Sequence, residues 1–185
     1  SCESVIREID LLANKYKQEH ISFLDDNFLV NKDRAALLCN LIIQNNLHKK
    51  IKFACQSRAD NINEDILRIL KEANFTAIGL GIETGSDRLM KVINKGETVK
   101  DNIEAVRLLK KYRFNCCAFF MFGLPSETKM ERFKTYILAK NLRLKFAKFN
   151  NAVPYPGTAF FETAKKEGTL HIEKNWKNFN SVGGV

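Results

Sequence analysis

The sequence lacks several features that would place the protein in a membrane or outside the cell. No apolar run reaches the roughly 20 residues that a membrane-spanning helix needs. The first residues, Ser1 to Val5, hold no basic stretch followed by an apolar one, so no secretory signal is visible. The chain does not begin with methionine, and we therefore expect it to be processed or excised from a longer protein.

Regularly spaced cysteines are also lacking. The five cysteines are an odd number, and none lie at the close spacing that marks a metal site or a disulfide framework. The absence of such a framework predicts a reducing, cytoplasmic setting.

The size and composition are those of an ordinary globular domain. The 185 residues are 45% hydrophobic and 28% charged, and we predict a single domain over residues 1–185. The net charge of +9 raises the question of nucleic acid. However, the basic residues gather where helices are predicted to end, as at Lys110, Lys111 and Arg113, and the helix dipole favours cations there. Without any nucleic-acid recognition motif beside them, we do not expect a nucleic-acid partner.

Short apolar runs alternate with longer amphipathic segments along the chain. The runs predicted to be strands span residues 20–24, 51–55, 76–82, 115–122 and 146–153. The predicted helices span residues 4–16, 32–45, about 62–70, about 99–109, 127–142 and 158–166. Asn61 or Asn63 is expected to cap the third helix and Thr98 the fourth, and Gly168 is expected to end the last.

This regular alternation implies parallel strands joined by helical crossovers, and so an α/β fold. Either a partial barrel or an open doubly wound sheet fits the pattern. A barrel that opens with a helix lacks its first strand. We therefore expect an open sheet edge, at which another copy of the chain could pair.

Polar residues follow the ends of the predicted strands. They are Asp25, Asp26, Asn27, Gln56, Arg58, Glu83, Gly123 and Tyr155. Since the carboxyl ends of parallel strands meet at one edge, where ligands bind, these residues are predicted to face one cavity.

Simpler structural explanations of these residues stay open. Asp25 and Asp26 could cap the helix that follows them. Arg58 could pair with a nearby aspartate at the surface. Glu83 could form a structural salt bridge, and Lys95 could simply be solvated.

Two glycine-containing segments suggest phosphate binding but carry little weight. The run with Gly79, Gly81 and Gly85 has one residue too many before its last glycine and begins inside a strand, so it does not match the dinucleotide-binding pattern. The segment from Gly123 to Thr128 could accept a phosphate through free amides, but as a lone motif it is weak.

Five segments, taken together, resemble one family. In chain order they read FLDDNF (23–28), CQSRAD (55–60), LGIETGS (80–86, followed by Lys95-Gly96), FGLPSET (122–128) and PYPGT (154–158). They are similar to elements of radical S-adenosylmethionine (SAM) proteins, in the subgroup often fused to a cobalamin-binding domain. The match runs from about residue 3 to about residue 170. The resemblance implies a partial TIM-type (β/α)6 radical SAM barrel with parallel strands, whose first strand and cluster loop are missing.

The departures from the family pattern concern the cluster first. Family members carry C-x-x-x-C-x-x-C after the first strand, and its three thiolates hold a [4Fe-4S] cluster. That motif is absent, and Cys116 and Cys117 should point to opposite faces of a strand. We expect all five cysteines to be inert thiols, and we assign no metal ligand and no catalytic residue. Smaller, conservative departures are Thr84 for Ser, Ser126 for Gly, and Asn74 where Gly often ends the third helix.

The resemblance implies a SAM site. The residues implied to hold SAM are Asp25, Asp26, Asn27, Gln56, Arg58, Glu83, Lys95, Met121 and Val153. The backbone around Asp25, Asp26 and Asn27 would face the SAM amino group. Glu83 would meet the ribose or that amino group. Lys95 would bind the carboxylate through a charge-assisted bond. Met121 and the backbone near Val153 would flank the adenine.

The implied activity is reductive cleavage of SAM to a 5′-deoxyadenosyl radical, used for methyl transfer or oxidative cyclisation. The implied cofactors are SAM and a [4Fe-4S] cluster, with cobalamin in a separate domain. The implied partners are a small-molecule substrate and an electron donor such as flavodoxin or ferredoxin. This segment alone is expected to be inactive.

Two alternatives remain open. One is a tRNA-modifying methylthiotransferase or an elongator-like radical SAM enzyme, which the positive charge mildly favours. The other is a non-catalytic α/β barrel segment that acts as a binding module.

Overall fold

The computed structural model describes residues 1–168 of the chain. Its strands are β1 His20–Ser22, β2 Lys52–Ser57, β3 Phe75–Glu83, β4 Asn115–Phe122 and β5 Phe146–Asn151. Its helices are α1 Cys2–Asn14, α2 Lys32–Gln44, α3 Glu64–Glu72, α4 Asp87–Val92, α5 Val99–Lys111, α6 Lys129–Asn141 and α7 Ala159–Lys166. Two 3-10 turns, η1 Leu47–Lys49 and η2 Ala59–Asn61, flank β2. The part of the predicted single domain beyond residue 168 lies outside the described residues.

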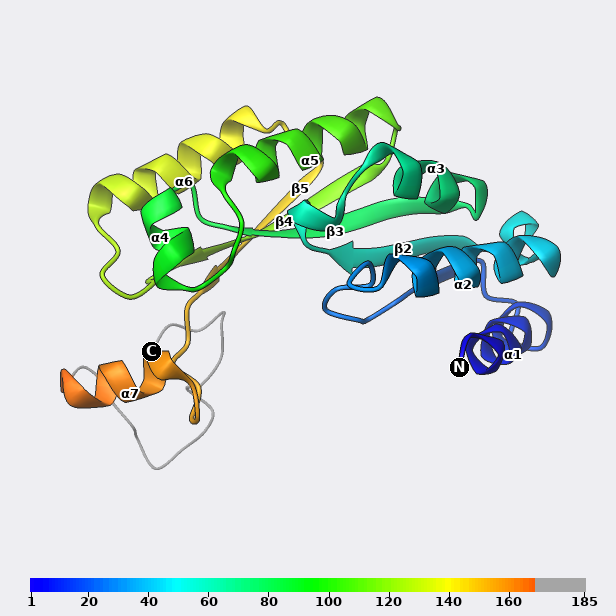
Figure 1. The fold of residues 1–185 in the computed structure, drawn as a ribbon, viewed down its shortest axis with the longest axis horizontal. Helices are drawn as coiled ribbons and strands as arrows, with labels where there is room; N and C mark the ends of the chain where they lie inside the picture. The colour runs from blue at the N-terminus through cyan, green and yellow to red at the C-terminus, as the bar shows by residue number, and fades with distance from the viewer. Residues whose placement is uncertain (169–185) are drawn as a thin grey trace.

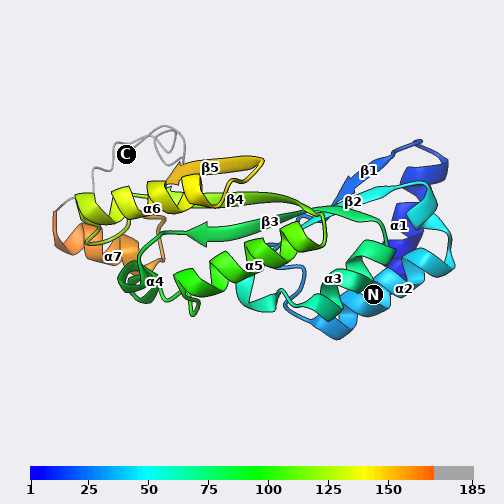
Figure 2. The same cartoon turned by 90° about the horizontal axis from the view of Figure 1, so that it is seen from above.

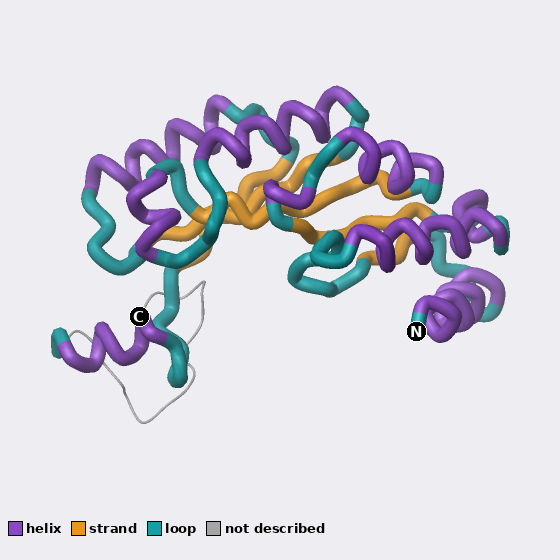
Figure 3. Tube along the Cα trace, viewed as in Figure 1, coloured by secondary structure: helices purple, strands orange, loops and turns teal. Residues whose placement is uncertain are grey.

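The five strands form one parallel sheet in the order β1-β2-β3-β4-β5 (Figure 2). Each strand pairs with the next one along the chain, so the strand order never reverses. A doubly wound sheet would contain such a reversal, and that alternative is therefore excluded for the described strands. Helices α2, α3, α5 and α6 lie along one face, and the sheet arches beneath them (Figures 1 and 3). The predicted partial barrel is therefore confirmed, and β1 and β5 are its two edges.

The predicted elements differ from the structure mainly at their ends. β1 stops at Ser22, although the amide of Phe23 still donates to the carbonyl of Ala54 at 2.9 Å. β5 ends at Asn151, two residues before the predicted end. The sequence pattern missed α4, because six residues are too few to show a helical period.

Four aromatic rings anchor the loop between β1 and α2. Phe23 and Phe28 pack against Phe53 of β2 and Phe75 of β3, with ring centroids 4.7 to 6.0 Å apart. Of the two phenylalanines of the FLDDNF segment, Phe28 is fully buried in the core and Phe23 packs against the core, partly buried. Their burial fixes the acidic residues between them at the carboxyl edge of the sheet.

Two of the departures from the family pattern occupy left-handed backbone positions. Asn74 has φ +64°, and its side-chain amide donates to the carbonyls of His48 at 2.9 Å and Ile51 at 2.8 Å. Ser126 has φ +57°, and Arg88 donates to both its hydroxyl (3.0 Å) and its carbonyl (2.8 Å). These hydrogen bonds offset the strain that glycine would avoid at each position.

The second half of the LGIETGS segment fastens α6 to the sheet. A Cβ on Gly85 would lie only 2.7 Å from the carbonyl oxygen of Lys134, so α6 approaches too closely for any larger residue. The Gly85 amide donates to the hydroxyl of Thr135 at 2.9 Å, and the Ser86 hydroxyl donates to Glu131 at 2.7 Å. The second half of the motif therefore serves packing, whereas Gly81 and Glu83 of its first half line a cavity.

Among residues 1–168, no helix combines the length and the apolar character needed to cross a membrane.

Candidate functional site

A polar cavity of about 350 Å³ lies at the carboxyl edge of the sheet. Six of the residues predicted to hold a ligand line it, namely Asp26, Gln56, Arg58, Glu83, Lys95 and Met121. They come from the loop after β1, from β2 and its following loop, from β3, from the loop after α4, and from β4. Segments far apart in the sequence thus meet at one cavity because the parallel strands end together.

An ion pair between Glu83 and Lys95 forms one wall of the cavity. The Lys95 ammonium lies 3.2 Å from the Glu83 carboxylate, and the two side chains are only 16% and 18% exposed. Glu83 holds a left-handed backbone with φ +63°, a conformation that costs a non-glycine residue of order 1–3 kcal/mol. Strain of this kind concentrates at ligand sites, where the surrounding structure maintains it.

Gly81 makes room for this ion pair. A Cβ at position 81 would lie 2.6 Å from the Glu83 carboxylate and 3.1 Å from the Lys95 ammonium. Only glycine leaves both charged groups where they are. The first half of the LGIETGS segment thus shapes the polar cavity.

Arg58 is fixed by two acids and one carbonyl. Its guanidinium contacts Asp60 at 2.8 Å and Glu97 at 3.4 Å, and it donates to the Lys95 carbonyl at 2.7 Å. The surface pairing expected for Arg58 with an aspartate is therefore present, but it is part of a larger network that also ties down the loop carrying Lys95.

Glu97 is the buried member of this network. Its side chain is fully buried, and one of its carboxylate oxygens has no hydrogen-bond partner. Burial raises the pKa of the Glu97 carboxyl, whereas the hydrogen bond from Arg58 lowers the pKa of Asp60. The sequence analysis did not single out Glu97, since nothing in the sequence shows that it turns inward.

Asn150 of β5 is a cavity residue that the sequence analysis missed. It lies opposite Met121 in the sheet, and its buried side-chain oxygen has no hydrogen-bond partner. A buried acceptor without a partner at a cavity wall is suited to a donor group on a ligand. The sequence signal that could have identified Asn150 is the alternation of side chains along β5. This alternation places Asn150 on the same face of the strand as Phe146 and Lys148.

Five of the predicted residues do not line the polar cavity. Val153 lines the apolar cavity described below, and Gly123 and Tyr155, predicted to face the same cavity, line neither of the two. The other two are Asp25 and Asn27, in the loop after β1. Asp25 is half-exposed and lies 3.9 Å from Arg34, while the amide of Asn27 donates to Asn61 at 2.8 Å. The capping explanation for the aspartates is wrong, because Asn31 caps α2. Asn27 instead ties the loop after β1 to η2.

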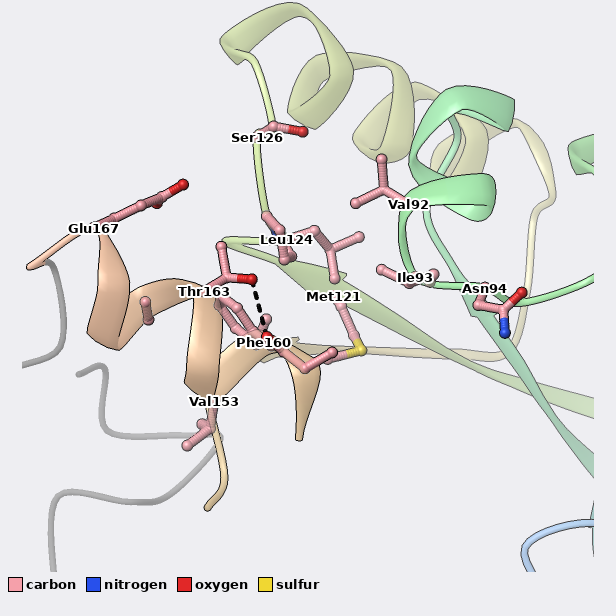
Figure 4. Close-up of a pocket in the computed structure, with 14 residues that line it drawn as sticks. Val92, Ile93, Asn94, Met121, Leu124, Ser126, Val153, Phe160, Thr163 and Glu167 are labelled. Atoms are coloured by element: carbon pink, nitrogen blue, oxygen red, sulfur yellow. Dashed lines mark hydrogen bonds between the residues drawn. The ribbon is translucent and has the colours of Figure 1, made fainter. Parts of the chain in front are cut away.

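A larger, mostly apolar cavity of about 610 Å³ adjoins the polar one, with α7 as one wall (Figure 4). Its apolar lining includes Leu124, Val153 and Phe160. The last residue of α4, Val92, and the residue after it, Ile93, also line this cavity. Met121 lines both cavities, so the polar and the apolar space meet at this side chain. The combined site suits a ligand with a charged end and a flat apolar end.

The cysteines do not fit an iron–sulfur cluster. All five are free thiols, and among residues 1–168 no three histidine, cysteine or acidic residues gather as a metal site would require. Burial raises the pKa of Cys39, Cys55 and Cys116 to about 12, so these thiols are not ready to ligate iron as thiolates. No reaction step through a cluster follows from these residues.

The fold and the site define a class of protein: a half-barrel of parallel α/β units with a ligand site at the carboxyl ends of its strands. The comparisons with known proteins name the family. The model of the Radical SAM superfamily matches residues 1–139, and the chain belongs to this superfamily.

Two relatives extend well beyond the part that matches this chain. An uncharacterised methyltransferase of Pyrococcus horikoshii is 35% identical over 185 residues, which are the whole of this chain and 40% of that protein. An anaerobic magnesium-protoporphyrin IX monomethyl ester cyclase of Cereibacter sphaeroides is 28% identical over 167 residues, 89% of this chain and 27% of that protein. The chain thus spans less than half the length of these two relatives.

Among solved structures, the radical SAM methyltransferase TsrM of Kitasatospora setae, with cobalamin and a [4Fe-4S] cluster bound, has the same fold. The TM-score is 0.78 at 18% identity, over 94% of this chain and 33% of that one. A likeness at this identity supports the half-barrel assignment and nothing finer.

Proposed function

We propose that the intact protein is a radical SAM enzyme that holds SAM across the two cavities at the carboxyl edge. The observation that carries this proposal is the partly buried Glu83–Lys95 ion pair beside a polar cavity. SAM ends in an amino acid, which bears an ammonium and a carboxylate. The Glu83 carboxylate and the Lys95 ammonium, held side by side, are complementary in charge to the ammonium and the carboxylate of SAM.

The polar end of SAM is proposed to bind as follows. Lys95 donates to the SAM carboxylate, and Glu83 accepts from the SAM ammonium. The unpartnered oxygen of Asn150 accepts a further hydrogen bond from the ligand. Arg58 is already bound to Asp60 and to the carbonyl of Lys95, so its role here is to position the Lys95 loop.

The adenine end is proposed to occupy the apolar cavity. Met121 and Val153 both line it, and a thioether packs well against an aromatic ring. Asp26 and Gln56 face the polar cavity between the two ends, where the ribose hydroxyls would lie. The roles of Asp25 and Asn27 are proposed to be limited to shaping the loop after β1.

The reaction class is proposed from the named relatives, which include a methyltransferase and a ring-forming cyclase. When bound, SAM and a reducing cluster supply the radical chemistry. The residues of this chain bind the SAM molecule, orient it and shield it from water. A cobalamin-binding domain, a small-molecule substrate and an electron donor such as flavodoxin or ferredoxin are proposed for the intact protein, in a cytoplasmic setting.

The proposal is tested by calorimetric titration of the intact protein with two ligands. SAM carries the charged end, and 5′-methylthioadenosine carries only the adenosine end. Lys95→Met is expected to weaken SAM binding about tenfold or more, because it removes a charge-assisted hydrogen bond worth about 1.5–3 kcal/mol. Affinity for 5′-methylthioadenosine should not change.

Lys91→Met is the matched control, since it removes the same charge from an exposed position on α4. It is expected to leave both affinities unchanged. Equal losses in the two variants, or a loss that extends to 5′-methylthioadenosine, would show that Lys95 does not bind the charged end of SAM.

A further inference from the structure

A second concave site lies at the opposite edge of the sheet, where β4 and β5 begin. This groove has a volume of about 400 Å³ and is lined by Lys110, Arg113, Arg143 and Lys145, with no acidic residue among its lining. Phe114 and Leu144 supply apolar surface between the cations. We refer to it as the basic groove. β4 spans eight residues, and at about 3.3 Å per residue it separates the basic groove from the carboxyl edge by roughly 25 Å.

Most of the charge in the basic groove is uncompensated. Within residues 1–168, the side chains of Arg113, Arg143 and Lys145 make no hydrogen bond and no ion pair, and all three residues are exposed. Lys110 donates to the carbonyl of Leu142 at 2.6 Å. Lys71 adds a fifth cation, because its ammonium lies 3.1 Å from the Arg113 carbonyl. So many like charges around one concavity repel one another unless an anion lies between them.

The two arginines also occupy unfavourable backbone positions. Arg113 follows the end of α5 with φ +56°, and Arg143 follows the end of α6 with φ +44°. At the equivalent positions after α2, α3 and α4, the chain places asparagine, which tolerates this conformation better. The helix dipole favours a cation near a helix end, but it does not require one at the strained residue. The chain thus places arginine, and not the better-suited asparagine, at the two helix ends that share this groove.

We propose that the basic groove binds the phosphate group of a small phosphorylated molecule. Two guanidinium groups can each offer a fork of donors to phosphate oxygens, and the ammonium of Lys145 adds a third charge. The apolar floor and the limited volume suit a compact ligand body rather than an extended polymer, because the lining comes only from the end of α5, the turns before β4 and β5, and the first residues of β4. This site is independent of the proposed SAM site.

The test is a calorimetric titration of the intact protein with sodium pyrophosphate at constant ionic strength. The variant Arg113→Asn/Arg143→Asn removes both charges and introduces the residue type that suits the backbone there, so it should fold as well as the wild type. Saturable binding of one pyrophosphate is expected for the wild type, with at least a tenfold loss of affinity in this variant. The control Lys32→Gln/Lys129→Gln removes the same charge from exposed lysines at the starts of α2 and α6 and should bind like the wild type.

Three results would overturn the proposal. Equal binding by the arginine variant and the wild type would mean that the two arginines do not bind the anion. An equal loss of affinity in the control would mean only a diffuse positive field. The third result comes from a parallel titration with a 12-residue oligouridylate. If that RNA binds more tightly than pyrophosphate, depends on the same arginines and weakens steeply with salt, the groove serves a nucleic acid and not a small phosphorylated molecule.

Discussion

At the scale of single residues, the site is built around Glu83 on a strained backbone. Its left-handed φ, its ion pair with Lys95 and the bare Cα of Gly81 beneath both groups depend on one another. A side chain at position 81 should displace the ion pair. Packing alone would not require this arrangement, because an unstrained strand end with a neutral side chain would fill the same space.

Gly81→Ala is expected to weaken SAM binding about tenfold, a loss of about 1.4 kcal/mol. The new methyl group would lie 2.6 Å from the Glu83 carboxylate and push the ion pair out of place. Calorimetric titration with SAM measures the effect, and 5′-methylthioadenosine serves as the internal control. A variant that binds SAM like the wild type would show that the ion pair does not need its present position.

Glu97→Gln tests the buried acid beside Arg58. Burial raises the Glu97 pKa above its ordinary value of 4.5, so the native state holds this proton more tightly than the unfolded state. The wild-type free energy of unfolding should therefore fall as the pH rises through 4.5 towards the native pKa. The variant has no such group, so its stability relative to the wild type should increase as the pH rises from 4.5 towards the native pKa, measured by urea unfolding. A difference in the free energy of unfolding between variant and wild type that stays constant with pH would contradict the raised pKa.

At the scale of elements, the joint between β3 and α6 fixes the carboxyl edge. Thr84, Gly85 and Ser86 follow β3 directly, and all three bond to Thr135 or Glu131 of α6. Arg88 of α4 adds two hydrogen bonds to Glu131. The loop after β3 and helix α4 are thus both joined to α6 through the Glu131 carboxylate.

Glu131→Gln should have the opposite pH trend to the Glu97 variant. The hydrogen bond from Arg88, followed by the one from Ser86, lowers the pKa of Glu131. Its stabilising effect is therefore complete above the ordinary value of 4.5 and is lost as the pH falls towards the native pKa. The variant should unfold at a lower urea concentration than the wild type at pH 7, and the difference should shrink below pH 4.5. A difference that grows on acidification would contradict the lowered pKa.

The elements were predictable where the pattern was long or capped. Thr98 and Asn63 cap α5 and α3, and Gly168 follows α7 with φ +68°, in accord with the sequence. α4 was not predicted because it is short, and Asn150 was missed because its role depends on which face of β5 turns inward. Glu97 was missed for a related reason: the fold of the loop after α4, and not a local pattern, buries it.

At the scale of the whole molecule, the half-barrel has two chemically distinct edges. The carboxyl edge mixes acids and bases around two cavities, and the amino edge of β4 and β5 carries the basic groove. The family and the fold could be predicted from five motif segments because their order reflects successive β/α units. The basic groove could not be predicted, since its arginines belong to no motif and come together only where the turns before β4 and β5 lie side by side.

The most direct test of the central claim is a crystal structure of the intact protein grown anaerobically with SAM. The SAM carboxylate should contact Lys95 and its ammonium Glu83, with the adenine beside Met121 and Val153. SAM bound at another place, with the Glu83–Lys95 pair unchanged and the two cavities holding no ligand, would contradict the assignment of this site.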